Sequence, residues 1–361
     1  MDFSKAFDKV GHKRLLMKLK RNGITKKTNK WIEGFLSDRH QTVVLEGETS
    51  YTADVVSGVP QGSVLGPSLF LFFINDMSDN ISSTVRLFAD DTIAYLAVKN
   101  EEDAQTLQAD LDKMAEWERL WQMEFHPDKC HVLRVSRNRR NIIRANYTLH
   151  GQTLKVVDNA KYLGITISHD LRWNDHIDNI TNRANRCLAF LRRNLRISSK
   201  NIKSLAYYSL VRPHLEYASV VWDPYTSKYV NKIEAVQRRA ARWVLNKYRY
   251  GPNTTPVSCM IDTLKWPLLS TRRQHARLQF FYKIINNIIQ INLPSYIKPP
   301  SHQHHTKYRQ AHNYAIPGST TSYHKNSFFP RTVRDWNLLA PQVASAPTIN
   351  SFKSKLSKLK N

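Results

Sequence analysis

Apolar residues at helical spacing predict helices in the first part of the chain. Leu15, Leu16 and Leu19 repeat at the period of one helix face, and Gly23 follows as a C-terminal cap, which predicts a helix over 12–22. Similar patterns predict further helices over 26–36, 67–77 and 101–121. In the last and longest of these, the apolar stripe passes Met114 and continues at Trp117 or Glu118.

Short runs of β-branched and aromatic residues alternate with these helices. Two such runs, 85–89 and 92–98, flank the pair Asp90-Asp91 and predict a hairpin with two acids at its turn. Two strands, 41–45 and 51–56, are predicted around a turn at Glu46-Gly47-Glu48. Further strands are predicted over 131–135, 147–149, 153–157 and 162–168. We therefore expect an α+β fold in which helices cover one side of a sheet.

The texture of the chain changes near residue 170. From there to about residue 290 the pattern is mostly helical and strongly basic, with arginines at 183, 186, 192, 193, 196, 238, 239 and 242. A segment rich in Pro, His, Ser and Thr follows over 294–318 and predicts a loop, and residues 328–340 are expected to pack back through Phe328, Phe329, Trp336 and Leu338. These changes predict three regions, 1–168, 169–255 and 256–361.

Charge narrows the class of partner. Lys and Arg number 54 against 29 Asp and Glu, a net charge of +25, and basic residues recur along nearly the whole length. Such an excess favours a polyanion, and nucleic acid fits better than a membrane because no run of about 20 apolar residues exists. Three widely spaced cysteines and the absence of a signal-peptide pattern predict an intracellular protein, with nucleus and cytoplasm both open.

Four histidines, at 302, 304, 305 and 312, form the one cluster that resembles a metal site by spacing alone. They lie in the Pro-rich segment with no cysteine nearby, so we expect no zinc there.

The pair Asp90-Asp91 is the first candidate for chemistry. Two carboxylates so close repel one another unless a cation neutralises them, and Mg²⁺ prefers oxygen ligands of this kind. An Asx-rich hairpin tip is the structural alternative. A third acid, Asp2, would complete a magnesium site if its strand lay beside the 85–98 hairpin, which spacing alone does not establish.

Five motifs in order resemble the palm motifs of the reverse transcriptases of non-LTR (LINE-type) retrotransposons. The first is Asp2-Phe3-Ser4-Lys5-Ala6-Phe7-Asp8, and the second runs from Ser57 to Pro67 as SGVPQGSVLGP. Phe88-Ala89-Asp90-Asp91 resembles the third, residues 117–130 the fourth, and Tyr162-Leu163-Gly164-Ile165 the fifth. The segment around Arg212–Ala218 is also similar to the region that follows the palm. His126 stands where the family usually carries Asn, so the sequence departs from the family's pattern at this position.

The resemblance implies a right-hand polymerase, with a palm and partial fingers over 1–168, a helical thumb-like region and a C-terminal region. It implies an RNA-directed DNA polymerase that adds dNTPs to a DNA primer on an RNA template. Two Mg²⁺ ions, with Mn²⁺ as an alternative, would be bound by Asp2, Asp90 and Asp91, and Lys129 would protonate pyrophosphate or form a surface salt bridge. The residues implied in substrate binding are Phe3, Phe7, Gly58, Pro60, Gln61, Gly62, Phe88 and Ala89.

Tyr162, Leu163 and Gly164 would place the primer end, with a purely structural hairpin as the alternative. Phe7 would exclude a 2′-hydroxyl or be a core residue, and the glycine loop would approach template and nucleotide or be an ordinary turn. The basic helices would track phosphates or be solvated faces.

The position of Asp2 near the start of the chain bears on activity. It predicts that upstream finger motifs are missing and that the chain is weak or inactive alone. The alternative to an enzyme is a non-catalytic nucleic-acid-binding relic of such an element.

Overall fold

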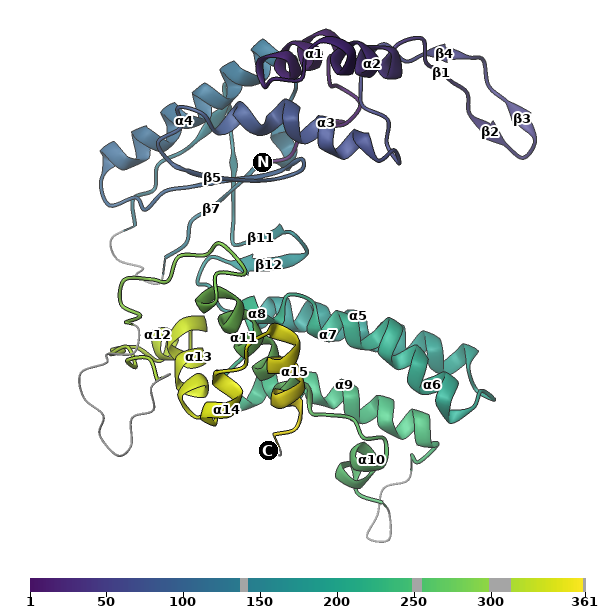
Figure 1. Ribbon diagram of the computed structural model, residues 1–361, viewed down its shortest axis with the longest axis vertical. Coiled ribbons are helices and arrows are strands. Elements are labelled where there is room, and N and C mark those ends of the chain that lie inside the picture. Colours follow the sequence, from purple (N-terminus) through teal and green to yellow (C-terminus); the bar gives the residue numbers. More distant parts are fainter. Residues whose placement is uncertain (137–141, 249–254, 299–312, 360–361) are drawn as a thin grey trace. The chain divides into compact units, whose positions relative to one another are not determined.

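The computed structural model describes residues 1–136, 142–248, 255–298 and 313–359. Two compact units divide the chain, Met1–Arg172 and Trp173–Asn361, and each is described by itself. The first mixes helices and strands and the second is helical throughout its described ranges, so the chain as a whole is of mixed α and β composition (Figure 1). The four histidines between 302 and 312 lie outside the described residues.

The predicted helices of the first unit are confirmed with small shifts at their ends. They are α1 (His12–Arg21), α2 (Lys26–Leu36), α3 (Leu65–Ile74) and α4 (Glu101–Trp121), with short 3₁₀ turns η1 (Asn75–Ser78) and η2 (Pro127–Lys129). Asn100 and Asp103 form a capping box at the start of α4. The apolar faces of α1, α3 and α4 share one core cluster with the β5–β6 hairpin (Thr84–Phe88 and Asp91–Tyr95).

The remaining strands pair mostly as hairpins. They are β1 (His40–Gln41), β2 (Val44–Leu45), β3 (Glu48–Thr49), β4 (Ala53–Asp54), β7 (His131–Leu133), β8 (Thr148–Leu149), β9 (Gln152–Thr153), β10 (Lys155–Val157), β11 (Asn159–Tyr162) and β12 (Ile165–Ser168). β10 pairs with β7 in parallel, whereas the other paired strands are antiparallel. The expected continuous sheet is therefore replaced, in the described residues, by short two-stranded ladders.

Several strand predictions were wrong in detail. The predicted strand 41–45 is divided into β1 and β2, and the predicted strand 153–157 into β9 and β10, because the two halves pair with different partners. The turn after β2 is Glu46-Gly47 alone, because both residues have positive φ (52° and 90°) and Glu48 already pairs in β3. The predicted strand 162–168 is two strands, since Leu163 and Gly164 also have positive φ and turn the chain. The β1–β4 segment extends beyond α2 as an arm with largely exposed side chains (Figure 1).

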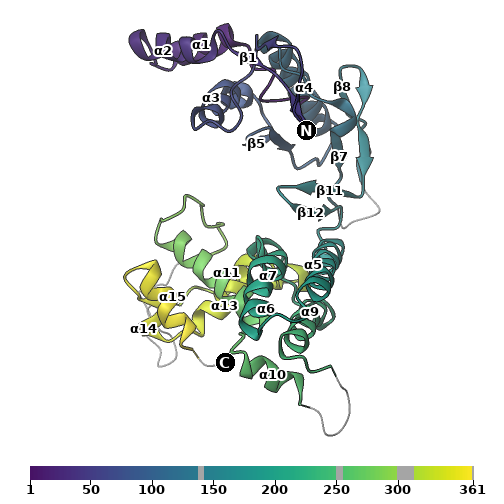
Figure 2. The same cartoon turned by 90° about the vertical axis from the view of Figure 1, so that its right-hand side faces the viewer.

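The second unit is built from α5 (Asn174–Asn194), α6 (Lys200–Ala206), a π turn η3 (Tyr207–Val211), α7 (Arg212–Glu216), α8 (Ser219–Trp222), α9 (Ser227–Leu245), α10 (Val257–Thr263), α11 (Leu269–Ile285), α12 (Ser322–Lys325), α13 (Phe328–Asn337), α14 (Pro341–Ala344) and α15 (Ile349–Ser357). Helices α5 and α9 run side by side (Figures 1 and 2). Its buried residues form two clusters that meet at α11. The predicted boundary near residue 256 stays a prediction.

A buried lysine ties three helices of the first unit together. Lys18 of α1 is 3% exposed and donates to the Asp76 carboxylate (2.5 Å) and to the carbonyl of Phe73 (2.5 Å). Its Nζ lies 3.6 Å from the ring centroid of Trp121 and 4.7 Å from that of Trp117. Burial is the main cause that lowers the pKa of Lys18 to about 8, although Asp76 opposes the shift.

This lysine predicts a pH-dependent stability. Because its folded pKa of about 8 lies below the ordinary value of 10.5, the unfolded state binds more protons between these pH values, so stability rises with pH there. The rise is up to about 3 kcal/mol for a shift of this size. Urea unfolding at pH 8 and pH 10 should show this rise for the wild type and not for Lys18→Met. The exposed neighbour provides the control, Lys20→Met, which should keep the rise; equal pH profiles for both variants would contradict the assignment.

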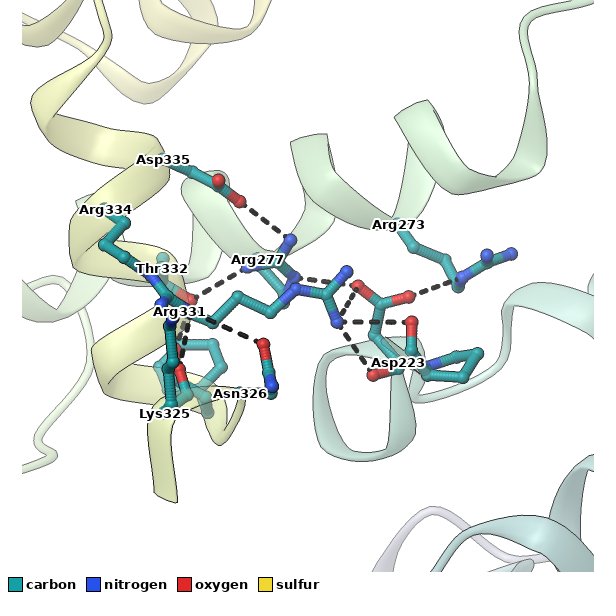
Figure 3. A network of polar contacts seen from close by, with 11 residues as sticks. Asp223, Arg273, Arg277, Lys325, Asn326, Arg331, Thr332, Arg334 and Asp335 are labelled. Atoms are coloured by element: carbon teal, nitrogen blue, oxygen red, sulfur yellow. Dashed lines mark hydrogen bonds and ion pairs between the residues drawn. The ribbon is translucent and has the colours of Figure 1, made fainter. Parts of the chain in front are cut away.

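A buried aspartate joins the helices of the second unit (Figure 3). Asp223, after α8, is 4% exposed and accepts from Nε of Arg273 (2.7 Å) and Nε of Arg277 (2.9 Å) on α11. Arg331 of α13 lies 3.3 Å from the same carboxylate, and Arg277 also donates to Asp335 (2.8 Å). One carboxylate therefore links the loop after α8 to α11 and α13.

Removing this carboxylate should leave buried guanidinium charges without their partner. We expect Asp223→Ala to lower the free energy of unfolding by about 3–5 kcal/mol, the usual cost of breaking a buried ion pair from one side. The matched control is Asp178→Ala, which removes a half-exposed pair with Lys232 and should cost less than about 1 kcal/mol. Equal losses in chemical denaturation of the two variants would show that the Asp223 network contributes no more than a surface pair.

Candidate active site

Residues 1–4 form a segment that lies between β6 on one side and residues 124–126 on the other. On one side, the Met1 ammonium donates to the carbonyl of Thr92 (2.7 Å) and the Thr92 amide donates to the carbonyl of Met1 (3.2 Å). On the other side, Phe3 forms an antiparallel bridge with Phe125. The amide of Ser4 donates to Glu124 (2.7 Å) and that of His126 to Asp2 (2.9 Å). The insertion places Asp2 beside β6, as the magnesium hypothesis requires.

The predicted β5–β6 hairpin is confirmed, but its turn lies one residue earlier than predicted, so only one of the two acids is in the turn. Phe88 pairs with Asp91, so Ala89 and Asp90 form a two-residue turn and Asp91 is the first residue of β6. Ala89 has a φ of 50°, in the left-handed region that non-glycine residues seldom adopt. Asp90 is half-buried and Asp91 is exposed.

The three carboxylates lie close enough to influence one another. The pKa of Asp91 is raised, first by loss of solvent around its carboxylate, although the residue as a whole is exposed, and then by the negative charges of Asp90 and Asp2. The Met1 ammonium and Lys161 of β11 oppose this shift. A raised carboxyl pKa of this origin marks a place where a cation would relieve repulsion.

Two residues of the fourth motif lie against Asp2. The Lys129 Nζ is 3.5 Å from Oδ2 of Asp2, and the lysine side chain is 54% exposed. Cys130, the next residue, is fully buried, and burial is the main cause that raises the pKa of its thiol. Lys129 thus adds a positive charge beside the partly exposed carboxylate of Asp2, where it could also attract an anionic group.

The glycine-rich second motif packs on the loop that follows Asp2. The Gly58 amide donates to Val10 (2.8 Å), and a Cβ at Gly58 would lie 2.9 Å from the main chain of Asp8. Gln61 donates to the Asp8 carboxylate (3.0 Å). At Gly66, where α3 begins, a Cβ would lie 2.3 Å from the carbonyl of Pro60. These glycines therefore have a packing reason of their own, whereas Gly62 (φ 82°) faces open space.

The predicted aromatic residues occupy different environments. Phe3 is 2% exposed and stacks on Phe125 with ring centroids 4.2 Å apart, so its ring belongs to the core. Phe7 is half-buried and stacks on Phe70 at 4.4 Å, which leaves part of the ring accessible. Phe88 is 62% exposed.

The fifth motif forms the β11–β12 hairpin, whose turn is Leu163-Gly164. The pKa of Tyr162, at the end of β11, is raised by burial and then by the charge of Asp91. Together with the effect of Lys161 on Asp91, this brings the hairpin into the electrostatic range of the acids.

Oxygen donors of this type suit Mg²⁺ or Mn²⁺. The described ranges hold no group of three His, Cys, Asp or Glu side chains already close enough to enclose a metal ion. The acids thus fit a metal by charge and donor chemistry, and further ligands would come from substrate phosphates and water.

Comparison with known proteins relates much of this chain to one class of polymerase. Residues 1–167 match the family model of reverse transcriptase (RNA-dependent DNA polymerase). The chain is 30% identical over 263 residues to the RNA-directed DNA polymerase from the mobile element jockey of Drosophila melanogaster, covering 67% of this chain and 27% of that protein. Residues 1–167 therefore form a reverse transcriptase domain of the non-LTR retrotransposon type.

Other relatives extend the likeness into the second unit. A probable RNA-directed DNA polymerase from transposon BS of the same fly is 30% identical over 278 residues, which is 71% of this chain and 29% of that protein. The Pol polyprotein of the R2 element of Popillia japonica is 27% identical over 187 residues, 46% of this chain and 30% of that protein. The chain thus spans less than a third of the length of these curated relatives.

Some residues around the three acids escaped the motif analysis. Lys161, Thr92 and Glu118 contribute charge or main-chain contacts around the acids. The signal for Glu118 was present, because it falls on the apolar stripe of the helix over 101–121, where a buried charge requires a partner. Lys161 and Thr92 carried no comparable signal, since each is one polar residue beside a motif.

The strained turn of the reverse transcriptase hairpin makes a prediction. At φ 50°, a β-branched residue at position 89 suffers more than alanine, so Ala89→Val should destabilise the protein by about 1–2 kcal/mol. Ala89→Gly should be neutral or stabilising by up to about 1 kcal/mol. Urea unfolding measures both. Exposed Ala97 lies outside the left-handed region, so Ala97→Val should change little; the opposite order at position 89 would contradict the turn geometry.

Proposed function

We propose that this chain carries the palm, with partial fingers, and a thumb-like region of an RNA-directed DNA polymerase that adds dNTPs to the 3′-hydroxyl of a DNA primer on an RNA template. The observation that carries the proposal is the insertion of residues 1–4 between β6 and residues 124–126. It brings Asp2 to Asp90 and Asp91 across about 90 residues of sequence.

Asp2 and Asp90 would hold two Mg²⁺ ions, or Mn²⁺, with Asp91 contributing less directly. When bound, such a pair of ions activates the attacking hydroxyl and stabilises the leaving pyrophosphate. The pKa of Asp91 is raised, in part by the charges of Asp90 and Asp2. Lys129 adds a positive charge 3.5 Å from Asp2. In this proposal Lys129 meets the phosphates of the nucleotide and donates a proton to the leaving group.

The remaining predicted residues would shape the substrate site. The accessible part of Phe7 lies on the loop after Asp2, where a ring beneath the sugar would exclude a 2′-hydroxyl. The backbone of Pro60, Gln61 and Gly62 and the exposed Phe88-Ala89 corner would contact template and nucleotide. The Tyr162-Leu163-Gly164 turn would place the primer end, an assignment supported by the charges that couple this hairpin to Asp91, since Asp91 contributes to the raised pKa of Tyr162 and Lys161 acts on the pKa of Asp91.

The second unit would bind the phosphates of the template–primer duplex. Its paired helices α5 and α9 carry exposed arginines at 183, 186, 192, 193 and 239, and exposed Arg196 follows the end of α5. Arg239 also bonds Asn185 across the pair (2.8 Å). Charges of one sign on adjacent helices attract a polyanion, and such binding should weaken steeply with salt.

Primer extension tests the proposal directly. The full chain is incubated with an oligo-dT primer on a poly-rA template, dTTP and Mg²⁺, and compared with Asp90→Ala and with the surface control Asp112→Ala. We expect dTMP incorporation by the wild type and by Asp112→Ala. Asp90→Ala should lose at least about a hundredfold in the rate of synthesis, because the two metal ions would lose one of their carboxylate ligands. Template–primer binding, measured in parallel at two salt concentrations, should be equal for all three proteins.

The alternative is a non-catalytic nucleic-acid-binding protein, which the charge of +25 favours independently of the acids. Salt-sensitive binding without synthesis by any of the three proteins would support that alternative and overturn the polymerase. Synthesis that survives Asp90→Ala would overturn the assignment of the acids.

A further inference from the structure

Glu118 is a buried carboxylate near the site with no role in the proposed chemistry. It lies on α4 with its side chain 4% exposed. Its Oε1 accepts from the amide of Phe125 (2.5 Å), and its Oε2 lies 2.9 Å from Nε2 of His150 in the β8–β9 turn. Burial is the main cause that raises the pKa of Glu118, while the bonds to Phe125 and His150 oppose it. A buried carboxylate lowers the free energy of unfolding unless its hydrogen bonds and ionic contacts offset the lost hydration.

The amide that donates to Glu118 is that of Phe125, in the segment 124–126 that pairs with residues 2–4. Around the Phe3–Phe125 bridge, the hydrogen bonds run from Ser4 to Glu124 and from His126 to Asp2. In this antiparallel pattern the two bridged residues do not bond each other, so the Phe125 amide points away from the Asp2 segment. Phe125 is fully buried, and its amide would lack a partner without Glu118.

The bond also selects which residue of 124–126 stands opposite Phe3. A slip of one residue would turn alternate side chains to the opposite face and carry Asp2 out of line with Asp90. The ladder around Phe3 is only one bridge long, so its own bonds specify register weakly. Glu118 is itself held in place, since its main-chain carbonyl accepts from Met123 (3.1 Å) and so fixes the turn that leads to Phe125.

We propose that Glu118 is a positioning residue for Asp2: its buried carboxylate fixes the register of residues 124–126 against the segment that carries Asp2. The inference rests on the proposed function in that Asp2 is taken as a metal ligand. His150 covers the second oxygen, and Glu124 and Cys130 are the other titratable groups that interact with Glu118. The positioning acts through the main chain and requires no contact between Glu118 and substrate.

The test compares Glu118→Leu with Glu118→Gln in the full chain. Glutamine keeps an acceptor for the Phe125 amide and leucine does not. Two controls separate position from stability. Glu116→Leu changes an exposed acid on the same helix, and Glu234→Leu removes a buried carboxylate of the second unit that accepts from the Ser270 amide (2.7 Å). Hydrogen exchange of residues 2–4 and 124–126 is measured by mass spectrometry, Mn²⁺ binding by electron paramagnetic resonance, and synthesis by primer extension.

Glu118→Leu should speed exchange in both segments by about tenfold or more and weaken Mn²⁺ binding by about 10- to 100-fold, while Glu118→Gln stays close to the wild type. Glu116→Leu should change neither quantity, and Glu234→Leu should destabilise the second unit without affecting them. Wild-type exchange in Glu118→Leu, or equal losses in the leucine and glutamine variants, would overturn the positioning role. If the wild type binds no Mn²⁺ and makes no DNA, the proposed function fails, whereas faster exchange confined to the two segments would still show that Glu118 holds the register.

Discussion

The main-chain hydrogen bonds of residues 1–4 are the constraint on which the candidate site depends. They join Met1 to Thr92 on one side and Asp2 and Ser4 to residues 124–126 on the other. Every one of these bonds connects segments about 90 or more residues apart, so each closes a long loop and depends on the packing of the helices between them to offset the lost chain entropy. The site is therefore a product of the whole first unit, and a defect in the packing of α1, α3 or α4 reaches the carboxylates through this segment.

Buried charges mark the junctions between elements in both units. Lys18 joins α1 to η1 and α4, Glu118 joins α4 to Phe125, and Asp223 joins the loop after α8 to α11 and α13. Each charged group loses hydration on folding, and hydrogen bonds that form in only one arrangement of the neighbouring elements compensate for this loss. An apolar residue in these places would pack with less cost but would tolerate sliding of the neighbouring element. We infer that these charges contribute more to a unique arrangement than to stability.

Local pattern predicted what depends on near neighbours. The helices over 12–22, 26–36 and 101–121 and the 85–98 hairpin follow from periodicity and capping within one segment. The parallel pairing of β7 with β10 and the packing of Gly58 on Asp8 did not follow, because each depends on a partner distant in sequence. Turns were misjudged where non-glycine residues adopt positive φ, as at Glu46 and Leu163, since composition carries little signal for such strain.

Motif resemblance and physical reasoning identify different parts of the same site. The motifs name the residues that would meet the substrate, because their chemistry limits which side chains can stand there. They assign no role to Glu118, although it lies within the range of the fourth motif, because what is required there is an acceptor for the Phe125 amide at one point on a helix face. A charged residue on an otherwise apolar stripe nevertheless announces such a requirement, since burial without a partner is too costly to persist. Lys18 and Glu234 follow the same rule, since Lys18 donates to the carbonyl of Phe73 and Glu234 accepts from the amide of Ser270. Charged residues that interrupt an apolar helix stripe therefore indicate, more directly than other positions in this sequence, where a contact with a distant segment forms.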